Sequence, residues 1–160
     1  MELNGARILI TGGATGIGRA IAEKAVAGGA KVALCGRRAS VLEETAAAVG
    51  ATAIPCDVSR EEQVEALFER ATRELGGLDV LVNNAAVGYS APLVDLDPTR
   101  FREVFETNVF GAMLCGRAAA QHFVEHGGGT IVNVGSTAAR KGYPGGSAYG
   151  SSKFALTGLT

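Results

Sequence analysis

Short apolar runs rich in β-branched residues alternate with longer amphipathic stretches along the whole chain. Near-continuous apolar runs of this length are typical of strands in a parallel sheet that is covered on both faces. The sequence therefore predicts strands at residues 7–11, 31–35, 52–56, 78–82 and 130–134.

The stretches between these runs predict helices with recognisable ends. Ser40 with Glu43, and Ser59 with Glu62, have the spacing of a capping box, which places a helix start at each serine. Pro98 suits the first turn of a long helix that ends near a run of three glycines. The expected helices cover residues 16–28, 40–49, 59–76 and 98–125, and a last one begins near residue 148.

This alternation of strands and helices predicts an α/β fold with a doubly wound parallel sheet. Right-handed crossovers that reverse direction after the third strand give the strand order 3-2-1-4-5, as in a Rossmann-like sheet. A length of 160 residues suits a single domain, so we expect residues 1–160 to form one domain.

Composition and charge narrow the class of partner. With 47% hydrophobic and 19% charged residues, the chain can bury enough apolar area to offset its ordering entropy, which excludes general disorder. There are 15 basic and 16 acidic residues, and this balance argues against nucleic acid or an acidic membrane surface as a partner. No apolar run is long enough to span a bilayer, and the first residues lack the pattern of a secretory signal. We therefore expect a cytoplasmic protein.

The metal-ligating residue types form no recognisable site. Cys35, Cys56 and Cys115 are odd in number and widely spaced, which predicts buried reduced thiols rather than a disulfide framework or a zinc site. His122 and His126 have the spacing of a chelating pair on a helix, but no third ligand lies nearby in sequence. A solvated helix end explains them better, and no metal is predicted.

A glycine-rich loop follows the first predicted strand and opens the first helix. Its spacing is G-x-x-x-G-x-G, with Gly12 allowing a tight turn, Gly16 allowing a pyrophosphate to approach the backbone, and Gly18 allowing the helix to lie close to the sheet. The N-terminus of the helix offers free N–H groups to phosphates. A turn that serves packing alone is the alternative, but the position between strand and helix favours dinucleotide binding.

The end of the second strand indicates which dinucleotide. NAD sites of this type place a carboxylate there for the adenosine ribose, whereas this chain has Arg37 and Arg38 after a glycine. Because a guanidinium can bind a 2′-phosphate, we expect NADP(H), with NAD(H) as the alternative. The alternative role for the two arginines is that of solvated loop charges. Asp57 after the third strand can accept from the adenine amine, and Asn84 and Ala85 lie at the same edge of the sheet.

A pair of residues near the end of the chain suits proton transfer. Tyr149 and Lys153 are four apart on a predicted helix and therefore share one face, and Ser136 precedes Tyr149 by thirteen residues. A phenol exchanges its proton reluctantly at neutral pH, but a neighbouring ammonium favours the phenolate. The pair therefore suits interconversion of an alcohol and a carbonyl. Alone it is a weak indication, but it becomes strong when joined to the glycine loop.

With these residues in view, the chain resembles the short-chain dehydrogenase/reductase family over essentially its whole length. The motifs that carry the resemblance, in family order, are Thr11-Gly12-x-x-x-Gly16-x-Gly18, Asp57-Val58, Asn83-Asn84-Ala85, Asn108, Ser136 and Tyr149-x-x-x-Lys153. The resemblance implies NAD(P)-dependent oxidation of a small-molecule alcohol or reduction of a carbonyl.

The resemblance also implies a role for each matching residue. Tyr149 is the expected general acid/base, Ser136 hydrogen-bonds the substrate oxygen, and Lys153 holds the nicotinamide ribose and favours the tyrosine phenolate. Asn108 is similar to the family asparagine that anchors a proton-relay water, although by itself it would be an ordinary polar residue tolerated in a helix. The expected cofactor-binding residues are Gly12, Thr15, Gly16, Ile17, Gly18, Arg37, Arg38, Asp57, Val58, Asn84, Ala85, Tyr149 and Lys153.

The chain departs from the family pattern in two places. Ala86 stands where the family usually has glycine, a small change. The larger departure is at the end, because family members continue through two more strands, a Pro-Gly segment beside the nicotinamide and a substrate-covering loop. We therefore expect a truncated chain with little or no catalysis alone. In the family, the long helix and the tyrosine-bearing helix usually form a subunit interface, which implies a homo-oligomer, either a dimer or a tetramer.

Three functions are compatible with these features. An NADP(H)-dependent oxidoreductase accounts for the glycine loop together with Ser136, Tyr149 and Lys153. An NADP(H)-binding module without turnover is the alternative, because the substrate-covering part is absent from the sequence. A scaffold that binds nothing leaves the glycine loop unexplained.

Overall fold

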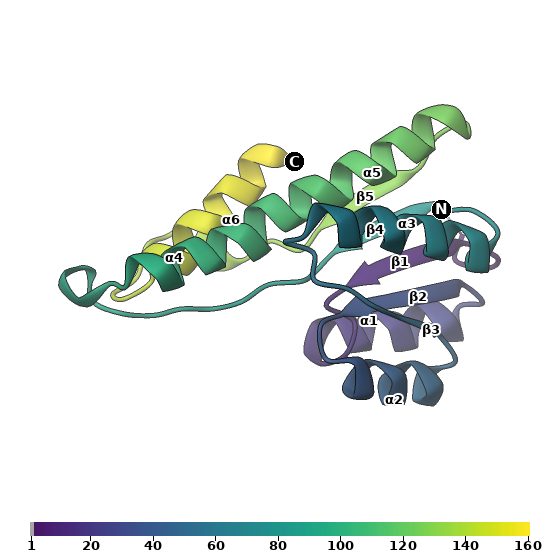
Figure 1. Ribbon diagram of the computed structural model, residues 1–160, viewed down its shortest axis with the longest axis horizontal. Helices are drawn as coiled ribbons and strands as arrows, with labels where there is room; N and C mark the ends of the chain where they lie inside the picture. Colours follow the sequence, from purple (N-terminus) through teal and green to yellow (C-terminus); the bar gives the residue numbers. More distant parts are fainter. Residues whose placement is uncertain (1) are drawn as a thin grey trace.

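A five-stranded parallel sheet forms the centre of the computed structural model, which describes residues 2–160 (Figure 1). The strand order is β3-β2-β1-β4-β5, which confirms the order predicted from the crossovers. The strands are β1 (Arg7–Thr11), β2 (Lys31–Gly36), β3 (Thr52–Pro55), β4 (Val80–Asn83) and β5 (Thr130–Asn133).

Helices cover both faces of the sheet, as the near-continuous apolar strands predict (Figure 1). Ile8 and Ile10 of β1 pack towards α1 and α2, whereas Leu9 packs towards α3 and α5. Fully burying one such side chain contributes roughly 1.5–3 kcal/mol, so these two apolar layers hold the sheet in place. The helices are α1 (Gly16–Ala27), α2 (Ala39–Val49), α3 (Glu61–Leu75), α4 (Pro98–Phe105), α5 (Gly111–Glu125) and α6 (Ser147–Leu159).

The long helix predicted over residues 98–125 is interrupted by a π-helical turn. The turn covers Glu106–Phe110, so that α4 and α5 run on in line with one another (Figure 1). Pro98 occupies the first turn as predicted, and the carboxylate of Asp97 caps it by accepting from the Thr99 N–H at 2.8 Å. Single π-helical turns inside α-helices are frequently found at functional sites.

Both predicted capping boxes are wrong. The structure begins α2 after Arg38 and α3 after Arg60, and neither helix has a side-chain cap. Ser59 instead donates its hydroxyl to the Asp57 carboxylate at 2.8 Å. The predicted C-terminal ends of these two helices are confirmed. Gly50 and Gly76 are the C-caps of α2 and α3, with positive φ angles of 76° and 78°.

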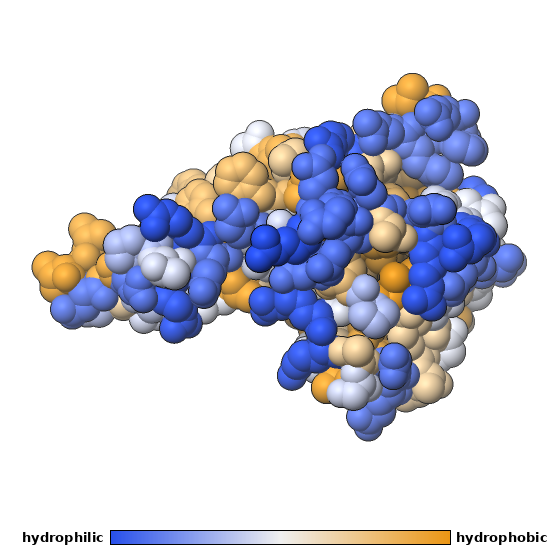
Figure 2. Space-filling view, viewed as in Figure 1, coloured by the Kyte–Doolittle hydropathy of each residue, from blue (hydrophilic) through white to orange (hydrophobic). Residues whose placement is uncertain are grey.

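Apolar side chains remain exposed on one side of the molecule. We call residues 84–105 the arm, because this segment extends away from the sheet with α6 beside it (Figure 1). Figure 2 shows apolar surface at the tip of the arm and along the adjoining helices. The exposed large apolar residues there and on the edge strand β5 include Leu93, Val94, Phe110, Ile131, Val132, Phe154 and Leu159. No helix within residues 2–160 is long and apolar enough to cross a membrane.

An ion pair joins the start of β1 to the residue before β4. The Arg7 guanidinium donates to both carboxylate oxygens of Asp79, at 2.9 and 2.5 Å, and the Arg7 backbone N–H donates to the same carboxylate at 2.8 Å. Hydrogen bonding to Arg7 lowers the pKa of the Asp79 carboxyl. The ion pair thereby holds the start of β1 next to the start of β4.

Asp79→Asn should lower the free energy of unfolding by about 1 kcal/mol at neutral pH, a modest value because both side chains are about one-third exposed and screened by water. Since the folded-state pKa is lowered, this stability is present above the ordinary carboxyl pKa of about 4 and is lost as the pH falls through the lower folded value. Urea unfolding at neutral and acidic pH measures the difference, with the exposed Asp95→Asn as control. A difference between wild type and Asp79→Asn that stays constant with pH would contradict the electrostatic origin.

Candidate active site

A cavity of about 610 Å³ opens at the carboxyl ends of the central strands. It contains most of the predicted cofactor-binding residues, namely Gly12, Thr15, Ile17, Arg37, Arg38, Asp57, Val58, Asn84 and Ala85. The sequence argument missed the remaining lining residues, which are Ala14, Cys35, Gly36, Cys56, Ala86, Val87 and Thr107. The cavity corresponds to one part of the predicted site, because its lining does not include Gly16, Gly18, Asn108, Ser136, Tyr149 or Lys153.

The glycine loop is built so that backbone lies against backbone. A Cβ atom at Gly12 would lie 2.8 Å from the Ala85 Cα, and one at Gly18 would lie 2.3 Å from the Gly12 carbonyl oxygen. Neither position has room for a side chain. Gly16 meets nothing within 4 Å but has a φ of 57°, so there the requirement is conformational.

Asn84 and Thr11 hold the glycine loop against the turn that follows β4. The Asn84 side-chain amide donates to the carbonyl oxygens of Thr11 and Gly12, both at 3.0 Å. In return the buried Thr11 hydroxyl accepts from the N–H groups of Asn84 and Ala85, at 3.1 and 3.0 Å. The two segments therefore form one rigid wall of the cavity.

The opposite side of the cavity carries positive charge. Arg37 and Arg38 follow β2 with exposed side chains, and neither forms an ion pair with any other residue between 2 and 160. Asp57 lies nearby and accepts from the Ser59 N–H and hydroxyl at 3.1 and 2.8 Å through one carboxylate oxygen. Two guanidiniums are thus free to meet an anionic ligand at this edge.

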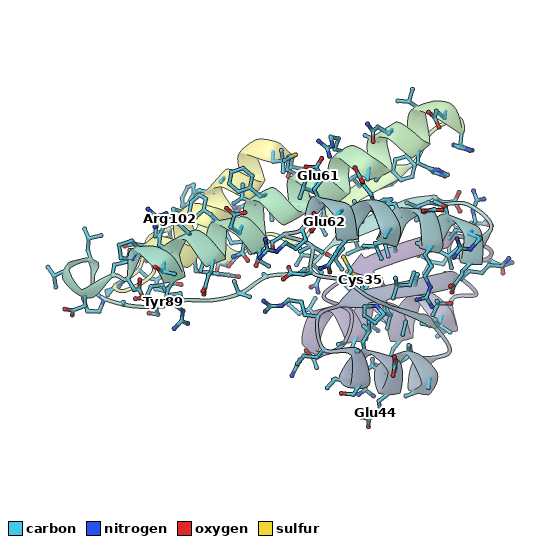
Figure 3. All side chains as sticks on the ribbon, viewed as in Figure 1. Cys35, Glu44, Glu61, Glu62, Tyr89 and Arg102 are labelled. Atoms are coloured by element: carbon cyan, nitrogen blue, oxygen red, sulfur yellow. The ribbon has the colours of Figure 1, made fainter. Side chains whose placement is uncertain are left out.

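A second cavity of about 760 Å³ adjoins the first and shares Arg37, Asp57, Val87 and Thr107 with it. Tyr89 and Arg102, which are labelled in Figure 3, line it from the arm. The Tyr89 hydroxyl accepts from the Asp97 N–H at 2.9 Å, and the Arg100 guanidinium lies 4.9 Å from the Tyr89 ring centroid.

Tyr149 and Lys153 occupy one side of α6, as their spacing predicts. Lys153 is only 3% exposed, and its ammonium donates to the Val134 carbonyl oxygen at 2.7 Å. The Lys153 Nζ lies 5.8 Å from the centroid of the half-buried Tyr149 ring. Burial lowers the pKa of Lys153. The hydrogen bond to the Val134 carbonyl oxygen, directly after β5, thus holds the Lys153 ammonium beside the Tyr149 ring.

Ser136 lies between β5 and a short 3₁₀ turn, Thr137–Ala139, that packs against α6. The Ser136 hydroxyl oxygen accepts from the Ala138 N–H at 3.1 Å. A Cβ atom at Gly150 would lie 3.6 Å from the Ala138 carbonyl oxygen, which shows how closely this turn approaches the helix next to Tyr149. The structure thus brings the segments of Ser136 and Tyr149 together.

Asn108 is fully buried in the π-helical turn, so the simpler interpretation as a tolerated surface residue is wrong. Its side-chain oxygen accepts from the Val87 N–H at 2.8 Å, and its amide donates to the Val87 carbonyl oxygen and to the Ser152 hydroxyl, both at 3.0 Å. Ser152 in turn donates to the Tyr149 carbonyl oxygen at 2.7 Å. Sequence reasoning missed Ser152, although an asparagine within an apolar helical stretch already indicated a buried partner.

The three cysteines are free and buried, as predicted. Cys35 and Cys56 lie at the floor of the first cavity, and Figure 3 shows Cys35 between the sheet and the helices above it. Burial raises the pKa of the Cys115 thiol to about 12.

His122 and His126 stack with ring centroids 4.0 Å apart at the end of α5. Within residues 2–160, no cluster of three or more side chains is arranged to hold a metal ion.

Comparisons with known proteins agree with this arrangement. A model of the short chain dehydrogenase family matches residues 6–160. A 2,5-dichloro-2,5-cyclohexadiene-1,4-diol dehydrogenase from Sphingobium indicum is 39% identical over 99% of this chain and 65% of its own length. A 3alpha-hydroxysteroid dehydrogenase from Mediterraneibacter gnavus is 33% identical over 100% of this chain and 67% of its own length.

Solved structures show the same fold. A short chain dehydrogenase from Mycobacterium smegmatis has a TM-score of 0.96 at 33% identity, and the match covers 99% of this chain and 70% of that one. An NAD+-bound xylitol dehydrogenase has a TM-score of 0.94 at 36% identity, covering 100% of this chain and 64% of that one. The chain therefore belongs to the short-chain dehydrogenase/reductase family, and it spans 65% of the length of its Sphingobium relative.

Proposed function

We propose that this chain carries the cofactor site and catalytic residues of an oxidoreductase that transfers a hydride between NADP(H) and an alcohol or carbonyl. One observation carries the proposal: the strand ends that shape the glycine-loop cavity adjoin β5 and α6, where Lys153 is buried beside Tyr149. A protein that only binds a nucleotide has no need of a proton donor such as the Tyr149 phenol. Its neighbours in sequence and structure include dehydrogenases named for a diol, a hydroxysteroid and xylitol.

The residues of the first cavity fit a dinucleotide. The loop around Gly12 and Gly16 offers backbone close to the space that a pyrophosphate needs, at the N-terminus of α1. Arg37, with Arg38 beside it, would hold a 2′-phosphate, and no carboxylate stands at the end of β2 to repel one. Asp57 would accept from the adenine amine. NAD(H) is the alternative cofactor, because one structural neighbour is an NAD+-bound xylitol dehydrogenase.

In the direction of carbonyl reduction, the Tyr149 phenol would donate its proton to the carbonyl oxygen of the substrate, while the Ser136 hydroxyl donates a hydrogen bond to the same oxygen. Bound NADPH would supply the hydride to the carbonyl carbon. The nearby Lys153 ammonium would favour the phenolate left on Tyr149, and its other donors would hold ribose hydroxyls. Asn108 would act through Val87 and Ser152 by keeping the surrounding backbone fixed, and a water held near it would relay the proton.

A module that binds NADP(H) without turnover is the second function. It predicts the same cofactor binding but no dependence of any reaction on Tyr149. The two proposals therefore separate on the tyrosine hydroxyl and not on the glycine loop. We propose further that the protein works in the cytoplasm as a homo-oligomer, a dimer or a tetramer.

Replacing Arg37 with alanine should weaken NADPH binding about 10- to 100-fold and leave NADH binding unchanged, because one charge-assisted phosphate contact contributes roughly 1.5–3 kcal/mol. Isothermal titration of both cofactors at one ionic strength gives the dissociation constants. Arg38→Ala tests the neighbouring guanidinium, and Arg73→Ala on α3 is a matched control away from the cavity. Equal wild-type affinities for NADPH and NADH would exclude the proposed preference.

Tyr149→Phe should reduce carbonyl turnover by about 10²- to 10⁴-fold while NADPH binding is retained, because the hydroxyl moves the proton and the ring keeps its packing. NADPH oxidation is followed with a panel of ketones. The assay uses this chain and, in parallel, this chain joined to the C-terminal third of its Sphingobium relative. Tyr143→Phe, at an exposed tyrosine on the preceding loop, is the control. Wild-type turnover by Tyr149→Phe would favour a different acid.

The exposed apolar side chains of α6 predict self-association, because water-exposed apolar area of this kind is typically covered by a partner. Phe154→Ser should shift the protein towards monomer in light scattering at matched concentrations. Val94→Ser, which removes an exposed apolar side chain at the tip of the arm, should not. A monodisperse wild-type monomer would contradict the proposed homo-oligomer.

A further inference from the structure

The hydroxyl of Thr45 is buried between α2 and the glycine loop. Thr45 is 4% exposed, and its Oγ1 donates to the Ala14 carbonyl oxygen at 2.8 Å. Threonine is a weak helix former, and burying its hydroxyl carries a cost unless a hydrogen bond compensates. An apolar side chain at this position would avoid the free-energy cost of burying a hydroxyl, so the hydrogen bond of Thr45 needs an explanation.

The direction of this hydrogen bond is unusual among the helical threonines. Thr72 and Thr157 donate back to carbonyl oxygens four residues earlier in their own helices, those of Phe68 and Lys153, at 2.8 and 3.0 Å. Thr45 donates instead to a loop 31 positions away in sequence. Within residues 2–160, no backbone N–H donates to the Ala14 carbonyl, so Thr45 supplies its hydrogen bond.

The bond sets the orientation of one peptide group in the loop. The peptide that joins Ala14 to Thr15 is trans, and in a trans peptide the carbonyl and the following N–H point in opposite directions. Because Thr45 holds the Ala14 carbonyl towards α2, the Thr15 N–H faces away from α2. Ala14 and Thr15 both line the first cavity, at the opening of α1.

The rest of the loop is tied down from other elements. The Gly13 N–H donates to the Cys35 carbonyl oxygen of β2 at 3.0 Å, and the Asn84 amide holds the Thr11 and Gly12 carbonyls from the β4 side. Thr45 therefore fixes the part of the loop that these contacts leave free.

We infer that Thr45 is a positioning residue for the phosphate-binding loop: through the Ala14 carbonyl, it fixes the loop backbone in the orientation that receives a dinucleotide pyrophosphate. This inference rests on the proposed dinucleotide function. Thr45 itself touches no phosphate. Its loss should therefore affect NADPH and NADH alike, whereas loss of a 2′-phosphate contact affects NADPH alone.

The test compares Thr45→Val, which keeps the shape and removes the hydroxyl, with Thr45→Ser, which keeps the hydroxyl. Thr72→Val is the matched control, because it removes a threonine-to-carbonyl bond of the same length on α3, away from the cavity. Dissociation constants for NADPH and NADH are measured by calorimetry, well below each variant's melting temperature. Amide hydrogen exchange of residues 12–18 is measured on the same samples. Thr45→Ala replaces the valine variant should the latter not fold.

Thr45→Val should weaken both cofactors by about 3- to 10-fold, the effect of one net hydrogen bond, and should speed exchange in the loop. Thr45→Ser should bind within about 2-fold of wild type, and Thr72→Val should bind as wild type does. Unchanged affinity in Thr45→Val, or a loss confined to NADPH, would overturn the positioning role while leaving the proposed function intact. Absence of binding by the wild type would refute the proposed cofactor and this inference together.

Discussion

The side-chain amide of Asn84 is the contact on which the geometry of the first cavity depends. From the end of β4, it donates to two carbonyl oxygens of the glycine loop. The Thr11 hydroxyl accepts in return from two backbone N–H groups of the turn after β4. Parallel strands end at the same edge of a sheet, but strand pairing alone does not hold the loops that follow the strands against one another. Here four hydrogen bonds join two such loops into one wall. Gly12 and Gly18 follow from this contact, because Ala85 and the Asn84 amide already occupy the space their side chains would need.

A second buried network performs the same task at the other end of the site. Asn108, Ser152 and the backbone of Val87 connect the arm, the π-helical turn and α6 without any exposed polar atom among the two side chains. Buried polar groups are costly when unpaired, so a fully paired network favours one arrangement over its alternatives. The network also reaches Tyr149, since Ser152 lies between Tyr149 and Lys153 in the helix and donates to the Tyr149 carbonyl oxygen. The carbonyl oxygen of Val134, the residue after β5, accepts from the Lys153 ammonium.

Local patterns in the sequence were enough for the sheet, for the C-terminal ends of α2 and α3, and for most of the cavity. Strand order follows from strand–helix alternation, and Arg37, Asp57 and Asn84 gather because strands that run in parallel deliver their next residues to one edge. Features that depend on distant partners escaped prediction. Ser59 donates to a neighbouring carboxylate and does not cap the helix, and Asn108 can be buried because α6 supplies Ser152, 44 positions later, as its partner. The bond from Thr45 to the glycine loop leaves no trace in local periodicity, since it joins two elements on opposite sides of β2 in the chain.

The pairing of β1 also decides when the fold can form. β1 lies between β2 and β4, and the Arg7–Asp79 contact spans 72 positions of the chain. During synthesis, β1 can pair with β2 as soon as the first helix closes, but its other edge stays open until β4 has left the ribosome. Non-local pairing of this kind slows folding and leaves an apolar strand edge available to other chains meanwhile. Until the fourth strand arrives, the first half of the molecule therefore carries an unpaired edge at β1 to which another chain can bind.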